Sequence, residues 1–186
     1  MQRKVTLLSF SQSEMLEEWK MRKGLFSGLR DCTAERDDGV DVDGLLLREI
    51  DSWYARLLAE APIDCLPVED VALECTVEIG ADLRVDVALP SRCVRLVSMK
   101  MKSWQEAVSQ FEKEGGMLAL RQANAWLRGG VCNPVCIAGI GRIRAYSAAA
   151  ATDELERLET VCFPENGNYV FTERAWTVFP ELFAAI

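Results

Sequence analysis

The feature that most constrains this chain is a change in the spacing of its apolar residues at Pro67. Before it, apolar side chains recur at helical spacing from Leu46 to Leu58, with Asp43 as the expected N-cap and Pro62 as the stop. After it, apolar and polar residues alternate from Val71 to Ile79, which is typical of a half-buried strand. A chain that carries both patterns in separate stretches is expected to fold as an α+β protein.

An earlier helix is predicted by Ser11 and Glu14, which have the spacing of a capping box and place its start near Gln12. Residues 1–62 are therefore expected to be mainly helical. The acid-rich stretch between Thr33 and Asp43 begins like a calcium loop, but it lacks the glutamate of the last ligand position and is interpreted as a solvated loop.

Residues 68–164 are expected to form mainly antiparallel strands. Gly80–Asp82 predicts a turn, with Leu83–Leu89 as the returning strand of a hairpin. A third strand is predicted over Val97–Met101, with Lys100 and Lys102 facing the glutamates of that hairpin. The remaining predicted elements are a short helix near 117–127, a second hairpin of 135–138 with 142–146, and a strand near 160–163.

The chain of 186 residues is predicted to be one domain, with N-terminal helices packed on a mostly antiparallel sheet built from hairpins. Its C-terminal segment, 165–186, is rich in aromatic residues, among them Trp176, Phe179 and Phe183. Docking of this segment within its own subunit is favoured, and the alternative is an arm that packs on a neighbouring subunit.

The residues present exclude several chemistries. The chain has no histidine, which argues against hydrolases of the triad type and most zinc enzymes. The seven cysteines are scattered and are interpreted as reduced and buried, since the separation of Cys132 and Cys136 does not match a zinc or redox pair. No catalytic, metal or cofactor site is predicted.

Two sharper alternatives fail on detail. The residues from Gly139 to Ala145 hold two glycines of a dinucleotide fingerprint without the third, and no helix is predicted after them, so they predict a turn. A metal-dependent nuclease would use Glu74 and Asp86 with Lys100, but the residue two before that lysine is serine rather than an acid. We therefore expect a protein that is not an enzyme.

No apolar run approaches the roughly 20 residues that span a bilayer, and the apolar N-terminal stretch is too short for a signal peptide. A cytoplasmic protein without a membrane partner is expected, or a virion protein if the chain is phage-derived.

Charge is segregated along the chain. Residues 31–90 hold 16 acidic and 4 basic side chains, whereas residues 91–144 hold 3 acidic and 9 basic ones. Pairing of the two segments within the fold is the favoured interpretation, and pairing between subunits is the alternative. The net charge of −8 argues against binding to duplex nucleic acid.

A candidate interface follows from these patterns. Arginine and tryptophan are enriched at the centres of protein interfaces, and this favours a protein partner over nucleic acid for the basic segment 91–144. The candidate interface residues are Arg121, Trp126, Arg128, Arg142, Arg144, Asp38, Asp41, Trp176, Phe179 and Phe183.

The order of several short phrases over residues 44–150 resembles a known family. The phrases are Leu89 with Pro90, Arg95 to Val97, Lys102 with Trp104, Arg128 with Gly129, Pro134 with Val135, and Tyr146 with Ser147. This pattern is similar to that of structural virion proteins of the head-to-tail region in tailed phages and prophages of Bacteroidetes, including crAss-like phages. The residues before Asp43 and after Ala150 have no counterpart in it.

The resemblance implies a non-enzymatic assembly protein, a connector or neck ring subunit that forms a homo-oligomer or binds other virion proteins. The alternative is a small intracellular adaptor or regulatory binding domain, which contacts nucleic acid through the basic segment.

If segregated charge supplies the two complementary surfaces of a ring subunit, oligomerisation should weaken with salt. Light scattering on the purified protein from low salt to about 1 M measures this. An association that is unchanged over that range would argue against a charged interface.

Overall fold

The capping box at Ser11 begins a helix, as the sequence predicts. In this computed structural model, which describes residues 6–25 and 41–185, α1 spans Gln12–Arg22. Ser11 Oγ accepts a hydrogen bond from the Glu14 amide, and the Glu14 carboxylate accepts one from the Ser11 amide. Two backbone donors that the helix leaves unpaired are thereby satisfied. The polar stretch of residues 33–40, predicted to be a loop, lies outside the described residues.

Helix α2 spans Val42–Glu60, and its N-cap is Asp41 rather than the predicted Asp43. The Asp41 carboxylate accepts a hydrogen bond of 2.9 Å from the Gly44 amide, three residues further on, as an N-cap requires. Asp43 lies within the first turn and forms an ion pair of 2.6 Å with Lys20 of α1. The predicted apolar stripe is confirmed, since Leu46, Ile50, Trp53, Tyr54, Leu57 and Leu58 are all buried.

The chain divides into two compact units. Unit 1 comprises Met1–Pro67 and Phe163–Ile186, and unit 2 comprises Val68–Cys162. The fold class is α+β, as predicted. The single domain over 1–186 stays a prediction, which one cooperative unfolding transition of both units would support.

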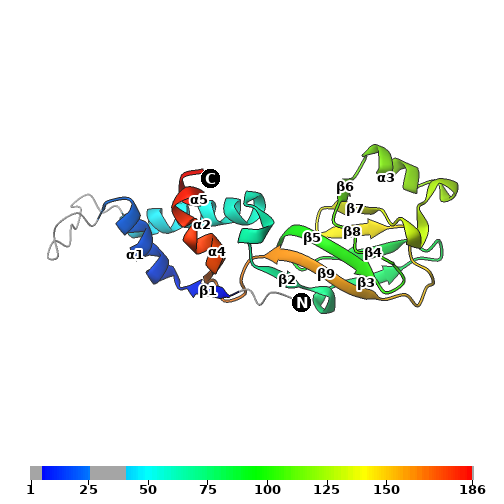
Figure 1. Cartoon of the computed structure of the whole chain (residues 1–186), viewed down its shortest axis with the longest axis horizontal. Helices are drawn as coiled ribbons and strands as arrows, with labels where there is room; N and C mark the ends of the chain where they lie inside the picture. The colour runs from blue at the N-terminus through cyan, green and yellow to red at the C-terminus, as the bar shows by residue number, and fades with distance from the viewer. Residues whose placement is uncertain (1–5, 26–40, 186) are drawn as a thin grey trace. The chain divides into compact units, whose positions relative to one another are not determined.

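Unit 1 combines helices with one pair of strands that come from the two ends of the chain (Figure 1). Besides α1 and α2 it contains β1 (Leu7–Phe10), the 3-10 turn η1 (Ile63–Cys65), β10 (Tyr169–Thr172), α4 (Glu173–Thr177) and α5 (Phe179–Ala185). Strands β1 and β10 pair antiparallel, with Leu7 opposite Thr172 and Phe10 opposite Tyr169. Tyr54 of α2 joins this pair, because its hydroxyl donates to the Val170 carbonyl and accepts from the Val170 amide.

Aromatic rings fill the core of unit 1. The ring centroids of Trp53 and Phe179 lie 5.0 Å apart, and those of Trp19 and Phe183 lie 4.4 Å apart. The Arg22 guanidinium lies 4.3 Å from the Phe179 ring centroid. The aromatic C-terminal segment therefore docks on helices of its own chain, as favoured from the sequence.

Unit 2 contains two sheets, whose strand orders are β2-β9-β5 and β3-β4-β8-β7-β6. Its strands are β2 (Val68–Asp70), β3 (Thr76–Ile79), β4 (Val85–Ala88), β5 (Cys93–Met101), β6 (Phe111–Lys113), β7 (Cys136–Gly139), β8 (Arg142–Ala145) and β9 (Leu155–Cys162). Its helical elements are α3 (Met117–Gln122) and the 3-10 turns η2 (Ala72–Glu74), η3 (Ala125–Leu127) and η4 (Gly130–Cys132). All strand pairs are antiparallel among the described strands except β6 with β7.

One apolar core serves both sheets of unit 2. It contains Val85 and Val87 of β4, Ile143 of β8, and Met99 and Leu158 of the smaller sheet, all fully buried. Both predicted hairpins are confirmed, as β3 pairs with β4 and β7 pairs with β8. The predicted helix near 117–127 is divided into α3 and η3.

The strand predicted from Val71 is wrong at its beginning. Residues Ala72–Glu74 form a 3-10 turn, and Leu73 is fully exposed. The Asp70 carboxylate explains the break, because it accepts hydrogen bonds from the amides of Ala72 and Leu158. A side chain that takes these donors stabilises a turn in place of a continuous ladder.

The predicted position of the third strand is also wrong. Strand β5 pairs with β9, whose long ladder begins at Leu155 rather than near residue 160, and not with the first hairpin. Lys100 and Lys102 therefore form ion pairs with Glu156 and Glu154 rather than with hairpin glutamates. A non-local strand pairing decides this, and the spacing of residues within one strand does not encode it.

The cysteines are free thiols in the described part of the chain, but not all are buried as predicted. Cys65, Cys136 and Cys162 are buried, Cys75 and Cys93 are partly exposed, and Cys132 is exposed. Cys132 belongs to η4, and none of the residues of this turn is buried.

Replacing Phe179 with alanine should lower the free energy of unfolding by about 3–5 kcal/mol, because the fully buried ring leaves a cavity beside Trp53. Urea unfolding followed by tryptophan fluorescence measures this. The control is Phe163→Ala, since that ring is 40% exposed and its loss should cost less than about 1 kcal/mol. Equal losses in the two variants would contradict docking of the C-terminal segment in unit 1.

Candidate interaction site

Arginines of the predicted basic segment lie on one face of the five-stranded sheet in unit 2. On β8, Arg142 and Arg144 alternate with the buried Ile143 and Ala145, so their side chains project away from the core. Asp86 of β4 is the register partner of Arg144. This alternation places the charged face opposite the apolar one.

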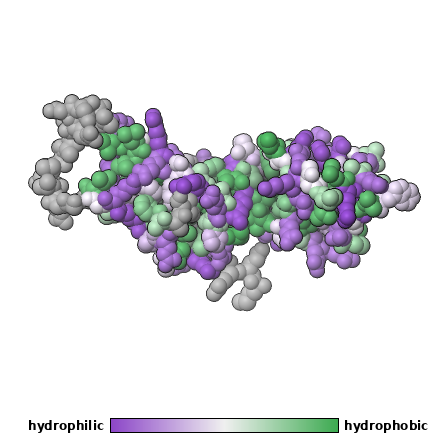
Figure 2. Space-filling view, turned by 90° about the horizontal axis from the view of Figure 1, so that it is seen from above, coloured by the Kyte–Doolittle hydropathy of each residue, from purple (hydrophilic) through white to green (hydrophobic). Residues whose placement is uncertain are grey.

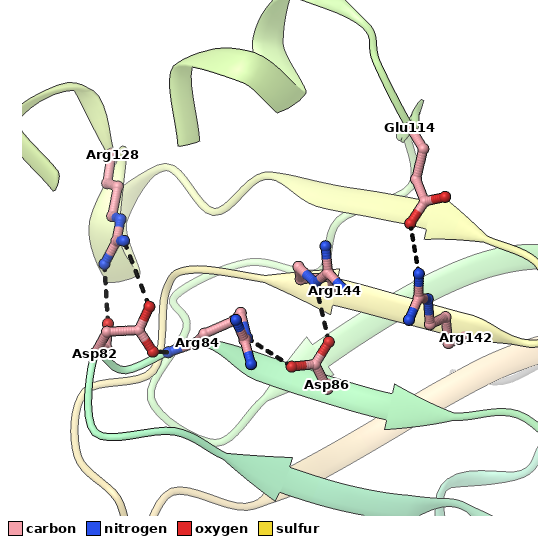
Figure 3. Close-up of polar contacts among 7 residues, drawn as sticks. All are labelled: Asp82, Arg84, Asp86, Glu114, Arg128, Arg142 and Arg144. Atoms are coloured by element: carbon pink, nitrogen blue, oxygen red, sulfur yellow. Dashed lines mark hydrogen bonds and ion pairs between the residues drawn. The ribbon is translucent and has the colours of Figure 1, made fainter. Parts of the chain in front are cut away.

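Asp86 is held between two arginines (Figure 3). Arg84 Nε donates to Asp86 Oδ2 at 2.7 Å, and Arg144 Nε donates to Asp86 Oδ1 at 3.0 Å. Burial acts to raise the pKa of Asp86, but the hydrogen bonds from Arg144 and Arg84 outweigh it and lower that pKa. The carboxylate is therefore charged at neutral pH, and each of its oxygen atoms accepts a hydrogen bond from one of the two arginines.

Arg128 ties the segment after α3 to the turn between β3 and β4. Its Nη1 donates to the Asp82 carbonyl and its Nε donates to the Gln122 carbonyl, each at 2.9 Å. Its Nη2 lies 3.6 Å from the Asp82 carboxylate, and its guanidinium lies 4.5 Å from the Tyr146 ring centroid. Arg128 thus acts as a cross-link within unit 2, because all three of its guanidinium nitrogen atoms contact Gln122 or Asp82.

The last two predicted arginines differ from one another. Arg142 forms an ion pair of 3.1 Å with Glu114, and both side chains are about half exposed. Arg121 is exposed on α3, and within residues 6–25 and 41–185 it makes no ion pair. Pairing of the acidic and basic segments within the fold is thus observed for Arg128 with Asp82 and for Arg144 with Asp86, whereas Glu114, the partner of Arg142, belongs to the basic segment itself.

A hollow of about 320 Å³ lies over β3, β4 and β8. It is lined by Thr76, Glu78, Arg84, Asp86, Val87, Ala88, Arg142 and Arg144. An anion that entered it would compete with Asp86 and Glu114 for the guanidinium groups. These contacts favour a structural role for the charged residues over ligand binding.

Apolar side chains are exposed next to these arginines. We call Met117, Leu118, Leu120, Trp126 and Leu127 the apolar segment; it lies on α3 and η3, on the β6 side of the five-stranded sheet (Figure 1). Met117 is 72% exposed, Leu120 63% and Trp126 94%. The space-filling view likewise shows hydrophobic residues at the surface of unit 2 among hydrophilic ones (Figure 2).

The backbone of the apolar segment is fixed although its side chains face solvent. Asn124 Oδ1 accepts a hydrogen bond of 3.0 Å from the Trp126 amide and so caps η3. Arg128, directly after η3, donates to the carbonyl of Gln122 at the end of α3 and to that of Asp82 in the turn between β3 and β4. Trp126 is therefore presented on an ordered turn, an arrangement that lowers the entropic cost of binding a partner.

The other predicted interface residues lie elsewhere. Asp41 caps α2, and Asp38 lies outside the described residues. Phe179 is fully buried in unit 1, where Trp176 and Phe183 pack around it. All three rings thus make contacts within unit 1, although Trp176 and Phe183 remain partly exposed.

Sequence reasoning identified Trp126 and the arginines but missed the leucines and Met117 of the apolar segment. The sequence did contain a signal for their exposure. The apolar residues of 117–127 do not lie on one face of a helix, so a single core could not bury all of them. The acidic partners Asp82 and Glu114 were also missed, since they come from turns distant in the sequence.

Replacing Asp86 with asparagine should lower the free energy of unfolding by about 1–2 kcal/mol at pH 7, because two charge-assisted hydrogen bonds are weakened. The pKa of Asp86 is lowered in the folded state, so its stabilising effect is present above its unfolded pKa and is lost as pH falls through the folded value. The difference between wild type and D86N should therefore shrink from pH 7 to pH 3 in urea unfolding. Glu78→Gln, on the same face, is the control and should show little effect at either pH.

Within the described ranges, no cluster of three or more acidic or cysteine side chains is arranged to hold a metal ion. None of the helices there combines the length and the apolar character needed to cross a bilayer. Comparison of the chain with protein-family models, curated proteins and solved structures found no match.

Proposed function

We propose that this protein is a structural assembly protein that binds other protein chains through the apolar segment and does not catalyse a reaction. The observation that carries the proposal is the exposure of Trp126, Met117 and Leu120 on an ordered turn and helix. The resemblance over residues 44–150 supports the more specific proposal of a connector or neck ring subunit from the head-to-tail region of a tailed phage or prophage.

The composition of the apolar segment is that of an interface centre. Tryptophan, methionine and arginine are enriched at such centres, and Arg121 supplies an exposed arginine within the same helix. Exposure of five large apolar side chains to water has an unfavourable free energy in the isolated chain. Covering these side chains in an interface removes that unfavourable term and so favours association. A folded chain that presents them on a fixed backbone is suited to assembly.

The internal pairing of charges makes an apolar interface the better supported one. Arg128, Arg142 and Arg144 already contact Asp82, Glu114 and Asp86. A partner that used these arginines would have to break ion pairs within unit 2. We therefore expect association to depend on the apolar segment more than on segregated charge.

The alternative is an adaptor that contacts single-stranded nucleic acid, with Trp126 as a stacking platform beside Arg121. It has less support, because a backbone-tracking groove needs several unpaired cations and three of the four predicted arginines are in ion pairs. Strong binding of an oligonucleotide at physiological salt would favour this alternative.

The test compares wild type with Trp126→Ser by light scattering across protein concentration, at low salt and at about 1 M salt. Wild type should form a defined multimer that persists at high salt, and Trp126→Ser should weaken association at least about tenfold. Because Trp126 is 94% exposed, the variant should keep the wild-type unfolding midpoint.

Leu73→Ser is the matched control, since Leu73 is also fully exposed in unit 2 but lies outside the apolar segment. It should associate like wild type. A multimer that salt dissolves equally in all three proteins would instead indicate a charged interface. A monomer under every condition would leave assembly dependent on a different partner chain, and mixing with neighbouring gene products would then test it.

A further inference from the structure

Three thiols that are far apart in the sequence meet in unit 2. Cys93 begins β5, Cys162 ends β9, and Cys75 lies between η2 and β3. Cys162 belongs to the apolar core of this unit, and Cys75 and Cys93 pack against it. None of the three has a role in the apolar segment or the charged face.

Cys93 and Cys162 are direct partners across the β5–β9 ladder. Residues directly opposite in antiparallel strands have Cα atoms about 4.5–5.5 Å apart, which lies within the range that a disulfide spans. The two side chains lie on the same face of the sheet and point toward the same core. Bond formation between them therefore needs little movement of the backbone.

A register shift produces this pairing. Leu96 lies opposite Thr160 and Arg95 opposite Val161, so an undisturbed ladder would place Val94 opposite Cys162. The irregularity between Cys93 and Arg95 shifts the register by one residue and brings Cys93 there instead. Bulges of this kind change which side chain faces a given partner.

The surroundings of the two sulfur atoms differ. Cys162 is 3% exposed, and its Sγ lies 3.1 Å from the buried Thr160 hydroxyl. Cys93 is partly exposed, so a small reagent reaches it first. The hydrogen bond with Cys162 lowers the pKa of Cys93, and Thr160 and Arg92 lower it further. The same hydrogen bond, together with burial, raises the pKa of Cys162. Cys93 is thus suited to act as the nucleophile that attacks a small disulfide, and Cys162 as the thiol that resolves the resulting mixed disulfide.

We propose that Cys93 and Cys162 form a reversible dithiol–disulfide site, which a low-molecular-weight disulfide such as oxidised glutathione converts to a cross-strand disulfide. The Cys93 thiolate attacks one sulfur of the small disulfide, a mixed disulfide forms, and one small thiolate leaves. The Cys162 thiol then loses its proton and attacks the Cys93 sulfur, and the second small thiolate leaves. The protein loses two electrons and two protons, and one small disulfide is reduced to two thiols.

The disulfide would join the beginning of β5 to the end of β9, at the last residue of unit 2. It closes a loop of about 70 residues, which constrains the unfolded chain strongly. Oxidation should therefore stabilise unit 2 against unfolding, and reduction should return it to its original stability.

In the test, the full chain is equilibrated in glutathione buffers of decreasing reduced-to-oxidised ratio. Thiol exchange is then quenched with acid, and the remaining thiols are alkylated under denaturing conditions. Peptide mass spectrometry should find Cys93–Cys162 as the predominant disulfide, reversed by dithiothreitol. The oxidised protein should melt at least about 5 °C higher than the reduced protein. This experiment on wild type needs no substitution that could disturb folding.

Three variants separate the roles. Cys162→Ser should accumulate the mixed disulfide of Cys93 with glutathione, because the resolving thiol is missing. Cys93→Ser should leave Cys162 unmodified. Cys75→Ser, the control from the same cluster, should form the disulfide as wild type does, since burial raises the pKa of Cys75 to about 11 and disfavours its thiolate.

Three outcomes would contradict a reversible disulfide between Cys93 and Cys162. A predominant Cys75–Cys93 disulfide, or a wild-type Cys93 that stays a thiol or a glutathione adduct at every buffer ratio, would overturn the proposal. So would modification of the buried Cys136 at the same buffer ratio as Cys93, because that would indicate reaction through the unfolded chain rather than a site in the fold.

Discussion

Strand β9 and its antiparallel pairing with β5 organise unit 2. This strand is central in the three-stranded sheet, pairing with β2 on one side and β5 on the other. Its Leu158 and Val161 are fully buried, and Leu158 joins the core shared with the five-stranded sheet. The same ladder places Lys100 and Lys102 against glutamates of β9 and Cys93 against Cys162. Loss of this one pairing would remove these ion pairs and the thiol pair together, and would displace Met99 and Leu158 from the core.

Most of the charged side chains considered in unit 2 form ion pairs with other residues of the same unit. The basic segment could have formed an open positive surface, but its arginines find carboxylates in turns and strands of the same unit. Asp86 between Arg84 and Arg144 is the clearest case, because both of its oxygen atoms accept hydrogen bonds. The acidic and basic stretches of the sequence thus help to hold one sheet face together, and the surface left for a partner is defined by apolar side chains.

That apolar surface and the thiol pair are separate features. Trp126 and its neighbours stay exposed because Asn124 and Arg128 fix their backbone outside the core. Cys93 and Cys162 lie instead at the start of β5 and at the end of β9, in the three-stranded sheet. An assembly protein with both features would bind partners through one surface and respond to small disulfides at another, and each property can be removed without the other.

The sequence by itself determined the fold class, the capping box at Ser11, the apolar stripe of α2 and both hairpins, because each depends on residues close together in the chain. Only the tertiary structure decided the partner of β5, the 3-10 turn at Ala72–Glu74 and the pairing of Cys93 with Cys162. These depend on contacts between distant segments, which local periodicity does not encode. The same reason explains the exposed leucines of α3, since their apolar character predicts burial and only the completed core shows that they lie outside it.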